Sequence, residues 1–398
     1  MGVIPLGERP SPSTPPRGLA PFALGFRPFF SLAGIAGLVL IPLWLVLWHS
    51  GSPIAHYGNI GWHSHEMLFG FTVAVISGFL LTAVRNWTGT DTLSGTPLAM
   101  LALLWLLARI VPFVPGMPPI GIALTDLAYL PLLAVALYAP LMGAENRINR
   151  IFLPLLGLMT LANLLVHLDH LGLTHTGQRG INLMVDLIML LLIMVSGRVV
   201  PFFAEKAVAG AKPRFDARRE RFAFVTIGIW TLLDLFLPLP WLLAPAALGV
   251  AAAQLWRLYD WHHPGIWRLP ILWVLYTGMA WLALGFLLKS LAAAGVFPAN
   301  LATHALTAGA IGTLVFGMMA RVALGHTGRE ITPARPIAYA FILLNLAALS
   351  RVFGPLLPVG SYIYWVMFSG AGWALCYLLF DIYYLRLLNT PRIDGRPG

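Results

Sequence analysis

The sequence predicts an all-α fold: a polytopic membrane helical bundle of about twelve transmembrane helices, with the N- and C-termini in the cytoplasm. The first observation is composition, since 59% of the residues are hydrophobic and 10% are charged, a balance far from that of soluble domains. The second is that apolar stretches long enough to cross about 30 Å of hydrocarbon recur along the whole chain. The third is that lysine and arginine concentrate in alternate connecting segments.

Length and hydropathy place each span in order along the chain. The predicted spans are 28–48, 63–84, 97–113, 119–140, 150–171, 179–201, 220–237, 240–257, 267–288, 299–323, 336–354 and 361–386. Residues 1–25 are rich in proline, glycine and serine and predict a disordered cytoplasmic tail, not a signal peptide. Residues 26–390 form one transmembrane bundle, and 391–398 form a cytoplasmic C-terminal tail.

Charge predicts the orientation. Only four of the 25 lysines and arginines fall on the outer side when the N-terminus is inside, namely Arg109, Arg179, Lys289 and Arg351. This bias predicts that the N-terminus and, with an even number of spans, the C-terminus lie in the cytoplasm, with the lipid bilayer as the surroundings of the spans. Because no soluble basic and aromatic face is present, no nucleic-acid partner is expected. The single cysteine, Cys376, excludes an intrachain disulfide and iron–sulfur clusters.

The histidines gather on one side of the predicted bundle. Eight of the eleven fall on the outer side, several of them at membrane depth. Acidic residues of the same outer third accompany them: Glu66, Asp126, Asp169, Asp186 and Asp234. Ionisable side chains in a membrane usually mark metal sites, cofactor sites or proton paths. The layer therefore predicts a metal or haem site, with Glu66 and Asp186 as candidate catalytic proton carriers; a neutral core acid is the alternative for Asp186.

The segment Trp62-His63-Ser64-His65-Glu66-Met67 begins the second span. On a helix, His63 and His65 point about 200° apart, so they cannot bind one ion. They can serve two centres on opposite faces, or one can be a ligand and the other its supporting group. The same spacing predicts one face with His63, Glu66 and Met67 and another with His65, Phe69 and Thr72.

The other histidines are constrained in the same way. His167 and His170 share a face, with Asn163 one turn earlier as a supporting partner. His304 and His326 lie about 33 Å apart along a continuous helix and cannot bind the same atom. Ligation is favoured for His63, His65 and His304, both interpretations stay open for His170, and His262 and His263 are expected in an interfacial loop.

The tenth span contains three glycines, Gly309, Gly312 and Gly317, which have no side chain and reduce the width of the helix. Small residues allow close approach of another helix or of a flat macrocycle. The sequence leaves these two uses open.

The chain resembles the NnrS family of bacterial membrane proteins. The resemblance rests on five segments: 25–30 (GFRPFF), 62–71 (WHSHEMLFGF), 86–89 (NWTG), 196–203 (SGRVVPFF) and the 304–329 block of the tenth span. It implies an inner-membrane protein that carries haem and copper and acts in the response to nitric oxide. It also implies cofactor ligands among His63, His65, His304 and His326, to which the outer layer adds His167 for the cofactor and His170 for a metal.

Two functional classes follow. One is a redox protein whose haem and copper bind or reduce nitric oxide, or sense it without turnover; enzyme activity and the electron donor stay open. The alternative is a transporter of copper, haem or a nitrosyl–metal species, which predicts inverted repeats and broken helices at the midplane. No cytochrome c attachment motif is present, so the haem is expected to be noncovalent.

Overall fold

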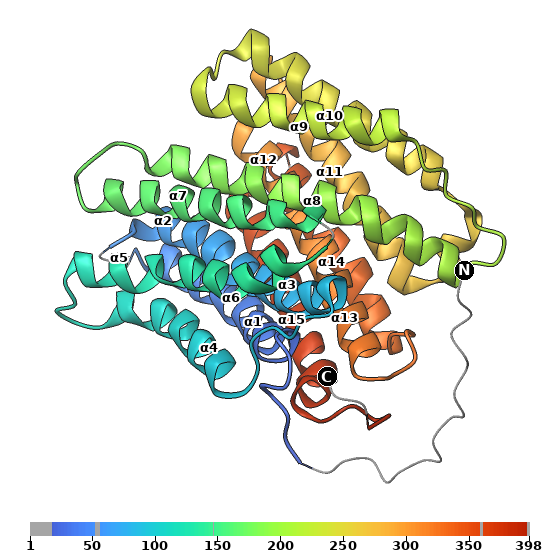
Figure 1. The fold of residues 1–398 in the computed structure, drawn as a ribbon. Coiled ribbons are helices and arrows are strands. Elements are labelled where there is room, and N and C mark those ends of the chain that lie inside the picture. Colours follow the sequence, from blue (N-terminus) through green and yellow to red (C-terminus); the bar gives the residue numbers. More distant parts are fainter. Residues whose placement is uncertain (1–17, 52–55, 146, 359–360, 396–398) are drawn as a thin grey trace.

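The computed structural model describes residues 18–51, 56–145, 147–358 and 361–395, and all regular structure within these ranges is helical (Figure 1). The described residues form twelve long helical segments. They are α1 (Phe26–Ser50), α2–η1–α3 (Gly58–His65, Glu66–Thr72, Val73–Thr88), α4–η2 (Gly95–Ile110, Val111–Phe113), α5–α6 (Pro119–Leu127, Tyr129–Gly143), η3–α7 (Arg147–Ile151, Phe152–His170), α8 (Gly177–Ala207), α9 (Ala217–Phe236), α10 (Pro240–Trp261), α11 (Pro270–Ala293), α12–η5–α13 (Ala299–His304, Ala305–Ile311, Gly312–His326), α14–η6 (Arg335–Phe353, Gly354–Leu356) and α15 (Tyr362–Asn389). One further short helix, η4 (Pro264–Arg268), joins α10 to α11. The prediction of a polytopic helical bundle is confirmed.

Eleven of these segments are long and apolar enough to cross a membrane. The exception is α9, which was predicted as a span at 220–237 and which carries four charged residues in its first turns. Two of these charges are paired inside the protein: Arg219 forms ion pairs with Glu220 at 3.1 Å and Asp260 at 2.6 Å, and Glu220 also pairs with Arg257 at 2.5 Å. The other two, Arg218 and Arg221, are exposed.

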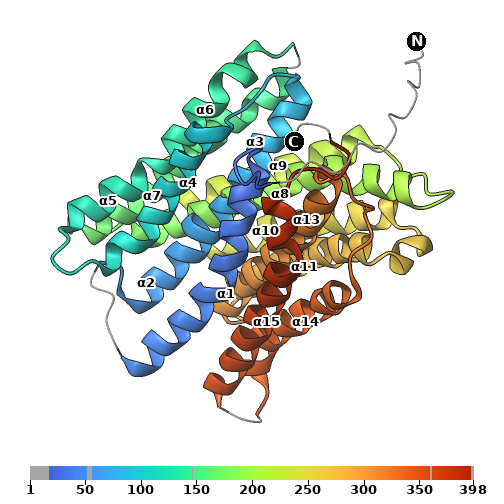
Figure 2. The same cartoon turned by 90° about the horizontal axis from the view of Figure 1, so that it is seen from below.

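The centre of the bundle consists of the segments Gly58–Thr88 and Ala299–His326, the most buried of the candidate spans. They lie between the pair α1–α15, which Figure 2 shows side by side, and α11. Helices α9 and α10 lie at one edge (Figure 1). The helices at the periphery expose leucine, isoleucine and phenylalanine, as expected of surfaces that contact lipid tails.

The two described ends of the chain lie together. Ala20 N donates to the carbonyl of Asn389 at 2.9 Å, so the start of α1 and the end of α15 lie on one side of the bundle. The predicted even number of crossings places both ends on one side, and the predicted orientation makes it the inner side. The first seventeen residues of the predicted N-terminal tail fall outside the described residues. Residues 391–395 turn back onto α13, where Arg392 donates to the carbonyl of His326 at 2.9 Å.

The glycines of the tenth predicted span serve helix packing. A Cβ at Gly309 would lie 2.6 Å from the ring of Trp281, and one at Gly312 would lie 2.7 Å from Trp373. At Gly317 the nearest atom would be Val274 Cγ1, at 2.7 Å. Because neighbouring side chains fill these positions, the alternative of a macrocycle against the glycines does not apply.

Candidate functional site

The two histidines of the 62–67 segment face opposite sides of α2. His63 lines an outer cavity together with residues of α1, α12, α14 and α15. His65 is fully buried on the other side, against residues of α5 and α7. This arrangement follows because His63 and His65 are two residues apart on a helix. The outer histidines are therefore divided between two separate groups of residues.

The first place is the buried cluster, defined as His65, Asp126 and His167. Ligand atoms of these three side chains lie within 4.8 Å of one another, and among the described residues they form the group with the geometry of a metal site. Asp126 Oδ2 is 3.1 Å from His65 Nε2 and 3.1 Å from His167 Nε2. Two imidazoles and one carboxylate are a donor set suited to copper, zinc or iron.

Polar partners hold the buried cluster in place. Asn163 Nδ2 donates to Asp126 Oδ2 at 2.6 Å, as expected for a residue one turn before His167. Arg109 donates to Asp126 and, at 3.1 Å, to Glu66 Oε2. Because each side chain is almost inaccessible to water, these charges are stable only as paired and hydrogen-bonded groups.

His56 and His170 cover the outer side of the buried cluster. His56 Nε2 lies 3.3 Å from His167 Nδ1, and the rings of His56 and His170 are 5.5 Å apart. Burial, with the neighbouring histidines, lowers the pKa of His56 to about 4, so His56 is neutral at pH 7. When the proton of this hydrogen bond is on His167 Nδ1, the Nε2 atom of His167 carries a lone pair that faces Asp126. A hydrogen bond of this kind fixes the tautomer and the orientation of a metal-binding imidazole.

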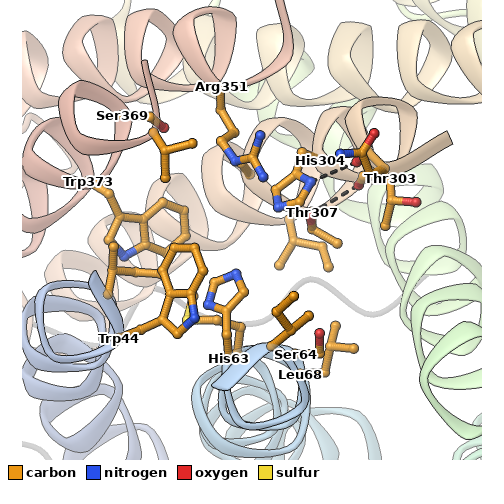
Figure 3. A pocket seen from close by; sticks show the side chains of 18 of the residues that line it. Trp44, His63, Ser64, Leu68, Thr303, His304, Thr307, Arg351, Ser369 and Trp373 are labelled. Carbon is orange, nitrogen blue, oxygen red and sulfur yellow. Dashed lines mark hydrogen bonds between the residues drawn. The ribbon is translucent and has the colours of Figure 1, made fainter. Parts of the chain in front are cut away.

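The second place is the outer cavity, a space of about 320 Å³ in the half of the bundle away from the termini. Figure 3 shows His63 and His304 on facing walls, with Trp44 and Trp373 along one side and Arg351 above. Its wall is mostly apolar, with a few polar groups that converge on the space. Such a combination is typical of cofactor and ligand sites.

His63 and His304 face each other across the outer cavity. Their ring centres are 6.5 Å apart and their planes differ by 10°. His304 Nδ1 donates to the carbonyl of Asn300 at 2.7 Å, which leaves Nε2 as the free ligand atom. The ring of Trp44 stacks on His63 at 4.2 Å and restricts its orientation.

Arg351 supplies a buried cation at the cavity. Its Nη2 donates to the hydroxyl of Tyr362 at 3.2 Å, while its buried Nη1 has no hydrogen-bond partner among the described residues. The side chain is 8% exposed. An unpartnered guanidinium nitrogen in an apolar wall favours an anionic group of a ligand.

A π-helical turn follows the histidines in both central segments. It is η1 after His65 and η5 after His304. Such turns are frequent at functional sites. The predicted faces are correct for Met67, which lines the cavity with His63, and for Phe69, whose ring centre is 5.0 Å from that of His65. They are wrong for Glu66, which lies with His65, and for Thr72, which lies at the end of the wider turn and lines the cavity. A face assigned by α-helical spacing fails once the period changes.

The structure separates the remaining predicted residues. His170 lies beside His56, outside the three-residue cluster. His326 is 22 residues after His304, at the end of α13 near the chain's termini, where its ring packs on Phe26, so the structure brings it into neither place. Asp186 Oδ1 accepts from Trp230 Nε1 at 2.8 Å, next to the cavity residue Val185.

The loop histidines of the inner side take part in local contacts. His262 Nε2 accepts from Trp267 Nε1 at 3.1 Å, and His263 Nδ1 accepts from the amide of Gly265 at 3.1 Å. They lie apart from both places.

Sequence reasoning missed Arg109 and Arg351 as site residues. The signal was available, because both belong to the four basic residues that fall on the predicted outer side. A third member, Lys289, donates to Thr303 Oγ1 at 2.9 Å, and Thr303 lines the cavity. Basic residues that oppose the orientation rule therefore deserve inspection as site residues.

A protein-family model matches this chain. The family model described as NnrS protein matches residues 20–392, which is nearly the whole chain. No curated protein matches the sequence significantly.

Proposed function

Because this chain belongs to the NnrS family, we propose that it is a haem- and copper-binding protein of the bacterial inner membrane that binds or reduces nitric oxide in the nitrosative stress response. The observation that carries the proposal is the division of the outer histidines between two faces of one helix. His63 lines the outer cavity, which offers space for a cofactor. His65 belongs to the buried cluster, which is suited to a single ion.

The residues of the outer cavity fit a haem. His63 and His304, which stand on facing walls, would hold the haem iron, and the flat rings of Trp44 and Trp373 provide apolar surface. The unpartnered Nη1 of Arg351 suits a propionate, because guanidinium binds carboxylates through charge-assisted hydrogen bonds. When bound, the haem would supply a redox-active iron with affinity for nitric oxide.

The residues of the buried cluster fit copper. Imidazole nitrogens are good ligands for copper, and Asp126 adds one carboxylate oxygen. Glu66 and Asp126 also form ion pairs with Arg109, which holds the Asp126 carboxylate beside the two imidazoles. Glu66 holds Arg109 and His65 in position and, in this arrangement, does not face the cavity.

Asp186 is our candidate for proton delivery to the outer cavity. It belongs to a group of ionisable residues with Asp234 and Lys289, which interact electrostatically across α8, α9 and α11. Lys289 connects this group to the cavity through its hydrogen bond to Thr303. Reduction of nitric oxide consumes protons, so a positioned acid beside the cavity supports the enzymatic form of the proposal.

The transporter alternative has less support. It predicts a binding site at the midplane. The ionisable residues of the cavity instead lie near the outer ends of their helices: His63 in α2, His304 in α12 and Arg351 in α14.

The test is an absorption spectrum and a metal analysis of the purified protein, recorded oxidised, reduced, and reduced with nitric oxide. We expect stoichiometric iron and copper and a Soret band that shifts when the gas is added. A protein that contains neither haem nor copper, after expression with adequate iron and copper, would refute the proposal and favour transport.

A further inference from the structure

The interface of α1 and α15 contains two buried polar atoms that lack hydrogen-bond partners among the described residues. They are Asp381 Oδ1 and the hydroxyl oxygen of Tyr377. Both side chains are buried, with Tyr377 at 0% and Asp381 at 7% exposure. Nearly all buried polar groups in proteins are hydrogen-bonded, so two orphaned atoms one helical turn apart require an explanation.

Helix α1 is shaped around these two side chains. A Cβ at Gly34 would lie 2.1 Å from Asp381 Oδ1, and one at Gly37 would lie 2.5 Å from the ring of Tyr377. Any larger residue at either position would collide with the polar side chain opposite. Glycine on α1 therefore makes room for an acid and a phenol at this depth, where apolar residues would pack at no cost in desolvation.

Tyr377 lies directly below the floor of the outer cavity. Its ring centre is 5.1 Å from that of Trp373 and 5.3 Å from that of Phe71, and both of these residues line the cavity. On α15 the residues Ser369, Trp373, Tyr377 and Asp381 follow one another at intervals of four and share a face. The Cα–Cβ bonds of a helix tilt toward its N-terminus, which for α15 is the outer end. The polar side chains are thus inclined toward the cavity.

Asp381 also approaches the inner surface. Two turns further along the same face of α15 lies Asn389, whose Nδ2 donates to Ser31 Oγ of α1 at 3.4 Å. Both are half-buried, and they lie at the inner end of the same α1–α15 interface. Polar groups therefore occur along this interface from the inner surface to Tyr377, and the apolar Leu385 interrupts them for one turn.

We propose that Asp381 and Tyr377 form a proton entrance that connects the inner surface with the floor of the outer cavity. Asp381 takes up a proton from the inner side and passes it toward the cavity by way of Tyr377 and a bridging water. The carboxyl group of Asp381 is then ionised again and can accept the next proton. Water is the partner that both orphaned atoms require, because a buried polar site recruits water where protein donors are absent. The inference rests on the proposed function, since reduction of nitric oxide provides the demand for protons.

This entrance is separate from Asp186. Asp186 lies on α8 in the outer half of the bundle, whereas Asp381 lies near the inner end of α15. An acid placed in a membrane span without an ion-pair partner is costly and usually functional. Among the described residues no basic side chain forms an ion pair with Asp381, so the proton itself is the counter-charge that allows its burial.

The first experiment tests the protonated acid without any need for haem. The purified protein in lipid vesicles is treated with dicyclohexylcarbodiimide, which adds to carboxylic acids that hold a proton in apolar surroundings. Mass spectrometry should find the adduct at Asp381, and Asp381→Asn should abolish it. Asp91, whose side chain is 84% exposed, is the internal control and should stay unmodified. An unmodified Asp381 would overturn the proposal.

The second experiment measures proton uptake. Vesicles that trap a pH-sensitive dye on the side of the protein's termini receive an electron donor and nitric oxide. Asp381→Asn and Tyr377→Phe should slow uptake from that side at least about tenfold, while the Soret band and the metal content stay those of the wild type. Tyr383→Phe, on the exposed side of the same helix, should leave uptake unchanged.

The outcomes separate the two proposals. Unchanged uptake in both entrance variants would refute the entrance and leave the proposed function standing. Absence of uptake in the wild type would refute proton-consuming turnover itself. Loss of the Soret band in Asp381→Asn would show that the residue supports the fold of the cavity, which also contradicts the entrance.

Discussion

At the scale of single residues, two basic side chains on the predicted outer side lie at the candidate centres. Arg109 pairs with the acids of the buried cluster, and Arg351 directs a free nitrogen at the outer cavity. A buried arginine is costly unless it has a partner. Each of these residues therefore implies a partner, a carboxylate pair in one case and a ligand in the other.

Histidine variants should separate the two centres. His63→Ala and His304→Ala are expected to lower bound haem, and His65→Ala is expected to lower bound copper, because each removes one proposed ligand. His262→Ala and His263→Ala should leave both cofactors intact, since these residues bond only within their loop. Soret absorbance and metal analysis measure the result. Equal losses in the two groups of variants would contradict the two-centre arrangement.

Arg351→Met should weaken haem binding and leave copper in place. The substitution keeps an apolar stem and removes the free guanidinium nitrogen. A hydrogen bond to a charged group contributes about 1.5–3 kcal/mol, so we expect a loss of roughly tenfold or more in affinity. Haem titration of the apoprotein measures this. Arg179→Met is the matched control, because Arg179 is an exposed arginine of the same predicted side; an equal loss in the control would rule out a specific contact.

At the scale of elements, the two π-helical turns determine which side chains meet. The η1 turn places Glu66 beside Arg109 and His65, and it returns Thr72 to the cavity wall. Regular α-helical spacing would have placed Thr72 on the face of His65. Gly70 lies within this turn and allows the close approach of α4, since Trp105 donates to its carbonyl at 3.0 Å.

Gly70→Ala tests the packing at η1. The new Cβ would lie 2.7 Å from Arg109 Nη1 and 2.9 Å from Glu66 Oε2, so it should displace a buried ion pair and lower both the melting temperature and the copper content. Gly157→Ala is the control: it lies within α7 with open space around its Cβ position and should stabilise the helix by up to about 1 kcal/mol. A Gly70→Ala protein that melts like the wild type would show that the turn tolerates the side chain.

At the scale of the whole molecule, the twelve helical segments place both described ends of the chain on one side and both candidate centres toward the other. Ligands for each centre come from helices far apart in the sequence. His63 and His304 are one example, and His65, Asp126 and His167 are another. The bundle therefore has to be assembled before either centre exists.

Cysteine accessibility should verify the orientation. In a Cys376→Ala background, Val296→Cys lies in a connection on the side away from the termini and Asp91→Cys lies on the side of the termini; both positions are exposed. A membrane-impermeant maleimide added to intact cells should modify only Val296→Cys, and permeabilised cells should show modification at both. The opposite pattern would place the termini outside and contradict the charge bias.

The sequence by itself determined the fold class, nearly all of the spans and the rule that His63 and His65 serve different faces, because composition, length and helical period are local properties. It also indicated an outer layer of ionisable groups. Only the tertiary structure decided that Asp126 joins His65 and His167, that Arg351 faces His63 and His304, and that His326 stays apart. These contacts depend on the packing partners of each helix and on two π-helical turns, and neither follows from a period measured along one segment of the chain.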